Sequence, residues 1–245
     1  MRFTLNLLAA TIAVVSLSHG QETIRVGAPM LAGATLPLGT TYIESFKVEK
    51  GIHTPINQSI QTIVRSVEDG VPVYQVSIVH WAIGGDSALT SITLREKDFS
   101  LLRHKVKAPR DSAVVMYSSG HLSGWVVLPE RPILLIDAKV PALVFPLDGP
   151  SPWLLSAFPL GENLSIILPR YSMWDNREVL TELKVVGTET LERGGMNIDC
   201  WKVDNGPFAI PGYRAYRWVD KKTKKILQTV LRGKADQPEY WSIAE

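Results

Sequence analysis

The chain has 245 residues, with 26 Lys and Arg, 24 Asp and Glu, and a formal net charge of +2. This near balance argues against a nucleic-acid partner, because proteins that bind nucleic acids usually carry a strong basic excess. The single cysteine, Cys200, excludes an internal disulfide, so the fold must be stabilised by its core.

The first twenty residues have the layout of a secretory signal peptide. Arg2 gives a positive start, Leu5–Leu17 is apolar, and Ser18–Gly20 supplies the small residues that signal peptidase requires. The apolar run is too short to span a bilayer. We therefore predict an exported protein, periplasmic or associated with the outer membrane, that is cleaved near Gly20 and has no transmembrane span in its mature chain.

The segment after the signal, residues 21–54, differs in composition from the rest of the chain. Its first part, Gln21–Thr41, is rich in Gly, Pro, Ala and Thr. This composition predicts that residues 21–54 form an extended N-terminal lead-in, which could include a first strand. A single β domain is predicted over residues 55–245.

Within that domain, β-rich runs recur at short intervals and are separated by turn residues. Asp69-Gly70 separates two of these runs, and Asp-Gly in this position indicates a hairpin. The runs are Gln58–Val67, Val71–Ala82, Ser87–Leu94, Leu101–Val106, Ala113–Ser119, His121–Leu128, Val179–Leu191 and Met196–Val203, with a further turn at Asp204–Gly206. Because long helical patterns are absent between them, the sheet is predicted to be antiparallel.

One short helix is predicted at Trp153–Phe158. Ser151 is a good N-cap residue, and Pro152 suits the first helical position. The preceding run, Val140–Pro150, is apolar but contains three prolines. These prolines predict irregular packing across the sheet rather than a central strand.

The stretch Tyr213–Arg232 predicts a hairpin whose strands are apolar on both faces. In its first arm, Tyr216 and Trp218 alternate with Ala215 and Val219. A sheet wetted on one side would alternate between apolar and polar residues instead. The fold class predicted from these residues is therefore mainly β, with a strongly curved antiparallel sheet whose concave interior is partly covered by a helix or the proline-rich segment.

Four stretches of the chain are similar, in order and spacing, to an uncharacterised family of bacterial envelope domains of unknown function. They are Ser91–Lys107, Asp148–Asn163, Glu182–Asp204 and Gly212–Gly233. The fold of that family resembles the lipoprotein-localisation factors, which are incomplete antiparallel β-barrels closed by helices. With this resemblance, the predicted fold is mainly β, a curved antiparallel sheet that forms an incomplete barrel with one short helix. The resemblance implies no catalytic residues. By analogy with the lipoprotein factors, it implies an acyl chain bound on the concave face.

Motifs for metals and nucleotides are absent from the sequence. His53, His80, His104 and His121 are scattered, without the His-x-x-x-His or His-Glu-x-x-His spacing of zinc sites. Neither Gly-x-Gly-x-x-Gly nor a phosphate-binding loop occurs. We predict no cofactor and no metal.

A hydrolase acting on envelope material is one alternative function. Ser119 lies close to His121, and the acid of such a site is unidentified. However, the stretch lacks the Gly-x-Ser-x-Gly pattern of a nucleophile elbow. Ser119-Gly120 is better interpreted as the turn of a hairpin. Separately, Asp137 and Asp148 lie in an apolar, proline-rich region where a paired acid/base site could lie, although two solvent-facing turn residues are far commoner in such a pattern.

The basic cluster Arg103–Lys107 with Arg110 is the densest positive patch of the chain. Lysines on an edge strand prevent strands of different molecules from pairing. We therefore predict that the cluster lies on a solvated edge strand and its loop, with attraction to an anionic lipid surface as the weaker interpretation.

The leading functional prediction is non-catalytic binding of a hydrophobic ligand, or of an outer-membrane component, in a concave site. The seven tryptophans either pack the core or line an apolar cavity. Trp81, Trp153, Phe158 and Trp218 are the candidates for lining that cavity. A third possibility is a structural subunit that adds its edge strands to an envelope partner.

Overall fold

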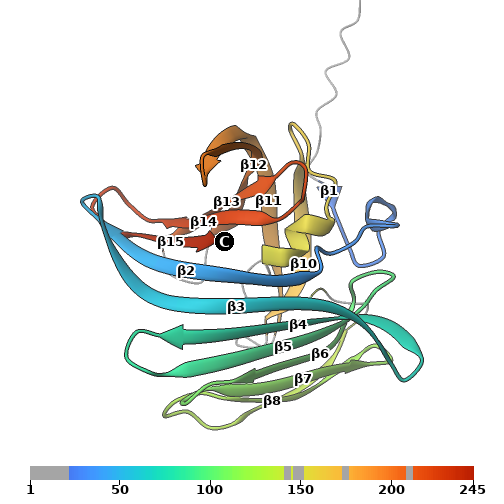
Figure 1. The fold of residues 1–245 in the computed structure, drawn as a ribbon. Coiled ribbons are helices and arrows are strands. Elements are labelled where there is room, and N and C mark those ends of the chain that lie inside the picture. Colours follow the sequence, from blue (N-terminus) through green and yellow to red (C-terminus); the bar gives the residue numbers. More distant parts are fainter. Residues whose placement is uncertain (1–21, 141–144, 146–151, 173–176, 208–211) are drawn as a thin grey trace, which may run out of the picture.

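The computed structural model, described over residues 22–140, 145, 152–172, 177–207 and 212–245, contains one large β-sheet (Figure 1). The order of its fifteen strands is β1-β10-β11-β12-β13-β14-β15-β2-β3-β4-β5-β6-β7-β8-β9. Neighbours pair antiparallel except β1 and β10, which are parallel. The strands are β1 (Glu22–Thr23), β2 (Gly39–Glu49), β3 (Ile52–Glu68), β4 (Val71–Ala82), β5 (Ser87–Arg95), β6 (Leu101–Lys107), β7 (Ser112–Ser118), β8 (His121–Val127), β9 (Leu134–Lys139), β10 (Ser165–Ser172), β11 (Arg177–Arg193), β12 (Met196–Pro207), β13 (Arg214–Asp220), β14 (Ile226–Arg232) and β15 (Glu239–Ala244). Two 3-10 helices, η1 (Pro29–Leu31) and η2 (Pro152–Ala157), interrupt the series.

The sheet is curved and does not close. In Figure 1, β2–β8 form one wall and β11–β14 the other, with η2, the yellow coil, between them. Among the described residues, the chain after β9 contacts β10 through one isolated parallel bridge, between Phe145 and Arg170. The predicted incomplete antiparallel barrel with one short helix is therefore confirmed, although the helix is a 3-10 helix.

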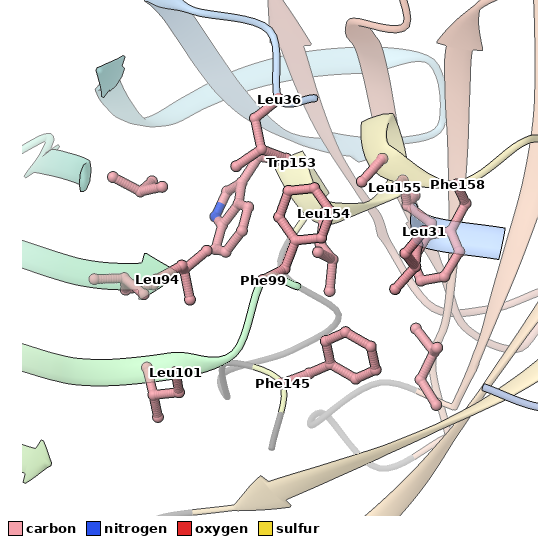
Figure 2. Packing of buried hydrophobic residues seen from close by; sticks show 14 of the residues in the cluster. Leu31, Leu36, Leu94, Phe99, Leu101, Phe145, Trp153, Leu154, Leu155 and Phe158 are labelled. Carbon is pink, nitrogen blue, oxygen red and sulfur yellow. The ribbon is translucent and has the colours of Figure 1, made fainter. Parts of the chain in front are cut away.

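The core lies on the concave face of the sheet. Segments outside the sheet fill much of it, and Figure 2 shows their side chains against those of the strands. They are Leu31 and Leu36 near the N-terminus, Phe99 between β5 and β6, Phe145, and Trp153, Leu154, Leu155 and Phe158 of η2 and the residue after it. Each fully buried side chain of this size stabilises the fold by about 1.5–3 kcal/mol.

Tyr74 connects the lead-in to this core. It is fully buried and stacks on Phe99 with the ring centroids 5.9 Å apart. The hydroxyl of Tyr74 accepts hydrogen bonds from the backbone N–H of Leu36 (3.4 Å) and from Arg65 Nη2 (3.2 Å). The chain between η1 and β2 is thereby held over the concave face.

Residues 21–54, predicted as a lead-in, contribute β1, η1, β2 and the first residues of β3 from Glu22 onward. The boundary between residues 54 and 55 therefore falls inside a strand. Most residues of β2 are partly or fully exposed, so this strand does not alternate clearly between a buried and an exposed face. Its pairing with β15, from the other end of the chain, places it in the middle of the sheet.

Two local predictions are wrong. The turn predicted at Asp204–Gly206 lies inside β12, where a β-bulge accommodates it: Gly206 has φ +70°, and its N–H donates to Asp204 Oδ1 at 2.8 Å. The basic cluster does not lie on an edge strand, because β6 runs between β5 and β7 and His104 is fully buried. Lys105 and Lys107 alternate with His104 and point to the exposed side.

Candidate functional site

A row of polar side chains crosses the concave face of the sheet. Residues that are direct partners in neighbouring strands share a face, and this register joins Asn57 of β3, Ser45 of β2, Ser242 of β15, Thr229 of β14 and Arg217 of β13. We call these five residues the polar row. With about 4.8 Å between strands, the row is roughly 19 Å long. It lies on the face that also carries Ile63 and Val219 of the hydrophobic core.

Arg217 ends this row inside the core. Its exposed fraction is 2%, and its neighbour in β12 is Val203, a core residue. Among the described residues, no hydrogen-bond partner reaches its Nε or Nη1. Burial lowers the pKa of Arg217 to about 9, so the guanidinium is still charged at neutral pH.

Asn205 lies on the same face, two residues beyond Val203 in β12. Its exposed fraction is 1%, and neither Oδ1 nor Nδ2 has a hydrogen-bond partner in the described part of the chain. A diagonal pair across two strands is separated by about 7–8 Å, which the long arginine side chain can span. The register thus makes Asn205 a diagonal neighbour of Arg217 at the edge of the β-bulge, and both are buried side chains with polar atoms that have no partner among the described residues.

At the opposite end of the polar row, only some of the polar atoms have hydrogen-bond partners among the described residues. Ser45 and Ser242 share a hydrogen bond of 3.0 Å between their hydroxyls, while Asn57 Oδ1 has no partner among the described residues. Beside the row, Ser59 Oγ lies 2.6 Å from His80 Nδ1. Burial lowers the pKa of His80, so the ring is neutral at pH 7.

The apolar part of the concave face is covered by η2. Ser156 of η2 donates a hydrogen bond of 2.6 Å to the carbonyl oxygen of Lys224, in the turn between β13 and β14. η2 also contacts β14. The same hairpin therefore carries both the buried arginine and the attachment of η2.

Only two of the four predicted cavity residues lie inside the sheet. Trp153 and Phe158 are each 2% exposed and belong to the main core (Figure 2). Trp81 is 40% exposed and, by the alternation of β4, lies on the opposite face from Tyr74. Trp218 also lies on the outer face, where it packs with Cys200 and Val230. The structure does not bring the four residues together.

The residues of the hydrolase alternative do not assemble into a catalytic group. His121 Nε2 lies 2.5 Å from Asp137 Oδ1, but the two side chains are 46% and 81% exposed. Ser119 occupies the predicted hairpin turn with φ +51°, and within the described residues no hydrogen bond joins it to His121. An activated nucleophile needs such a bond to its base. Asp148 lies outside the described residues.

In the part of the chain that the structure describes, no group of three or more His, Cys, Asp or Glu is arranged to hold a metal ion. No helix within the same residues is long and apolar enough to cross a membrane.

The sequence places Arg217 on one face with Ala215 and Val219, but it does not indicate that this face is the buried one. The sequence feature that could have identified Arg217 is its position between apolar residues in a strand that is apolar on both faces. Burial of charged side chains is rare unless they are paired. An arginine in this pattern is therefore a candidate for a functional role.

Comparison with known proteins supports the fold without indicating a reaction. No family model and no curated protein matches the chain. A solved structure, the β-barrel-like protein of domain of unknown function DUF1849 from Brucella abortus, matches with a TM-score of 0.52. The match has 10% sequence identity and covers 86% of this chain and 98% of that chain, so it shows the fold alone. The predicted likeness to a domain of unknown function is supported in this coarse form, while the likeness to lipoprotein-localisation factors stays a prediction. In its fold, the chain is thus similar to a β-barrel-like domain of unknown function.

Proposed function

We propose that this protein is an exported, non-catalytic binding protein that holds a hydrophobic ligand on the concave face of its sheet. The observation that carries the proposal is how this face is covered. The cover comes from η1, the chain at Leu36, and η2 with Phe158, rather than from a second sheet. Neither 3-10 helix is part of the strand ladder. A ligand can therefore replace their side chains without breaking the pairing of the strands.

The free energy of such an exchange is favourable for a long apolar chain. Each methylene removed from water contributes about 0.8 kcal/mol. Part of this gain is offset by exposing displaced side chains such as Trp153 and Phe158, and by the loss of translational freedom. Ligands with long acyl chains are consequently favoured over short ones.

The signal-peptide layout of residues 1–20 supports a place in the envelope. There, the molecules with long apolar chains are membrane lipids and components of the outer membrane. An exported carrier or sensor of these molecules is the function that we propose.

The proposal is tested by native mass spectrometry of protein purified from membrane-rich cells. We expect one lipid-sized adduct per chain, and tryptophan fluorescence that changes when the delipidated protein is titrated with oleate. A Trp153→Phe variant should lose most of the fluorescence change, whereas a Trp125→Phe variant on the outer face should keep it. Protein that is always ligand-free and binds no amphiphile in the titration would contradict the proposal.

A second candidate function, a subunit that pairs through an edge strand, is favoured by β9. Within the described residues β9 pairs only with β8, and Leu135 on it is 72% exposed. An apolar edge strand is a template for strand addition by another protein. Cross-linking in cells should capture a partner with the wild type and not with Leu135→Lys; a monomer in both preparations counts against this function.

A further inference from the structure

At Arg217, the polar row ends in a buried positive charge whose Nε and Nη1 have no partner among the described residues. We propose that Arg217 and Asn205 bind the anionic head group, a carboxylate or a phosphate, of an amphiphile whose chain lies on the apolar part of the concave face. This inference rests on the proposed function and names the class of ligand.

The first support is that the guanidinium of Arg217 has no ion-pair partner among the described residues. Other arginines on or beside the sheet have partners: Arg65 reaches Tyr74 and Glu96, Arg103 reaches Glu68, and Arg214 reaches Asp204. Arg217 is the most buried of these side chains, and no ion pair satisfies it among the described residues. A buried charge is costly unless it is paired and hydrogen-bonded. An anion from a ligand supplies the missing pair.

The second support is the hydrogen-bonding character of the surroundings. Carboxylate and phosphate oxygens accept several hydrogen bonds at once, and arginine binds them in a bidentate manner. Asn205, the diagonal neighbour of Arg217 in β12, has an Nδ2 donor without a partner among the described residues. Thr229, the next member of the polar row, adds a hydroxyl. In the described part of the chain, no carboxylate is paired with Nε or Nη1 of Arg217 or with Asn205.

The third support is the position of the pair at the border of the core. Val203 and Val219 flank Arg217 and belong to the same hydrophobic cluster as Trp153 and Phe158. A molecule with its head at Arg217 therefore places its chain where η2 now packs. This arrangement fits an amphiphile better than a small free anion, which would leave the apolar surface unused.

The test compares amphiphiles with the same chain and different head groups. The probes are oleate, oleoyl lysophosphatidate, neutral mono-oleoylglycerol and inorganic phosphate. Their Kd values are measured by calorimetry on delipidated full-length mature protein, with circular dichroism to verify folding. The variants are Arg217→Met, which keeps the length without the charge, and Arg214→Met, which removes an exposed arginine of the same strand.

We expect wild-type protein to bind oleate or oleoyl lysophosphatidate at least tenfold more tightly than mono-oleoylglycerol. Arg217→Met should lose this preference while binding mono-oleoylglycerol within about twofold of wild type, and Arg214→Met should resemble wild type. The tighter of the two anionic probes identifies the head group. If Arg217→Met does not fold, Asn205→Leu takes its place, with an expected loss of at least threefold in the preference.

Three results would overturn the inference. Equal affinity of wild type for charged and neutral amphiphiles, or a preference that survives in the variants, removes the anion site and leaves the proposed function standing. Inorganic phosphate that binds as tightly as oleoyl lysophosphatidate shows a site for a free anion and not for an amphiphile. Failure to bind any probe overturns the proposed function together with this inference.

Discussion

The side chain of Ser156 donates a hydrogen bond of 2.6 Å to the carbonyl oxygen of Lys224. Ser156 is buried in η2, and Lys224 has φ +61° in the turn of the β13–β14 hairpin. The bond therefore attaches the cover of the concave face to the hairpin that carries Arg217. Its loss should loosen η2 without disturbing the sheet.

We predict that Ser156→Ala lowers the free energy of unfolding by about 1 kcal/mol, since the partly buried carbonyl oxygen of Lys224 loses its donor. Hydrogen exchange of residues 153–158 should become faster, while exchange in β4 and β12 stays slow. The control is Ser118→Ala at an exposed position. Unchanged exchange in η2 would show that packing alone holds it.

Removing the buried charge should stabilise the ligand-free protein. At pH 7, Arg217→Met is expected to raise the free energy of unfolding by about 1–4 kcal/mol, because an apolar side chain of similar length needs no counter-charge. Arg214→Met removes an exposed pair with Asp204 and should cost no more than about 1 kcal/mol. Urea unfolding of ligand-free protein measures both. A strongly destabilised Arg217→Met would mean that the guanidinium is paired in solution.

The same arginine predicts a pH dependence. Burial lowers the folded-state pKa of Arg217 to about 9, well below its ordinary value, so the unfolded chain binds more protons than the folded chain above pH 9. The stability of the wild type relative to Arg217→Met should therefore rise with pH above 9. The difference between the two urea midpoints at pH 7 and pH 10 measures this effect. A constant difference would contradict the lowered pKa.

His104 predicts a loss of stability in acid. Burial lowers its pKa to about 4 from 6.5, and its cross-strand neighbours are the apolar Ile92 and Val115. Below pH 6.5 the unfolded chain takes up a proton that the folded chain does not, so stability falls between pH 6.5 and pH 4. Complete loss of this contribution amounts to about 3 kcal/mol. His104→Leu should flatten the pH profile of stability between pH 6.5 and pH 4 relative to wild type.

Cys200 is predicted to be unreactive in the folded protein. It is fully buried in the outer cluster with Trp218 and Val230, and burial raises the pKa of its thiol to about 11. Because the thiolate is the reactive form, iodoacetamide at pH 8 should modify Cys200 only after unfolding in urea. Rapid modification of the native protein would show that this cluster opens in solution.

The parts of the fold that depend on neighbouring residues were predictable from the sequence. The hairpin at Asp69-Gly70 is an example: both residues have positive φ, as a two-residue turn requires, and β4 has the predicted bounds Val71–Ala82. The short helix at Trp153 was also found. Its Pro152 and apolar run act within one turn, so no distant contact is needed to recognise it.

The parts that depend on distant residues were not predictable. β2 and β15 pair although Ser45 and Ser242 are 197 positions apart, and neither strand has a strong pattern by itself. Alternation separates the two faces of a strand without showing which one is concave. For this reason Trp81 and Trp218 were predicted to line the cavity, whereas Arg217, which does lie on that face, was not singled out.

The open edge of the curved sheet has a mechanical consequence. Neighbouring strands inside the sheet are joined by ladders, whereas among the described residues the chain after β9 makes one isolated bridge, between Phe145 and Arg170. Because no ladder closes the sheet there, its curvature can change without breaking the pairing of any two strands. The width of the concave side then depends on the volume of the side chains or ligand that fill it.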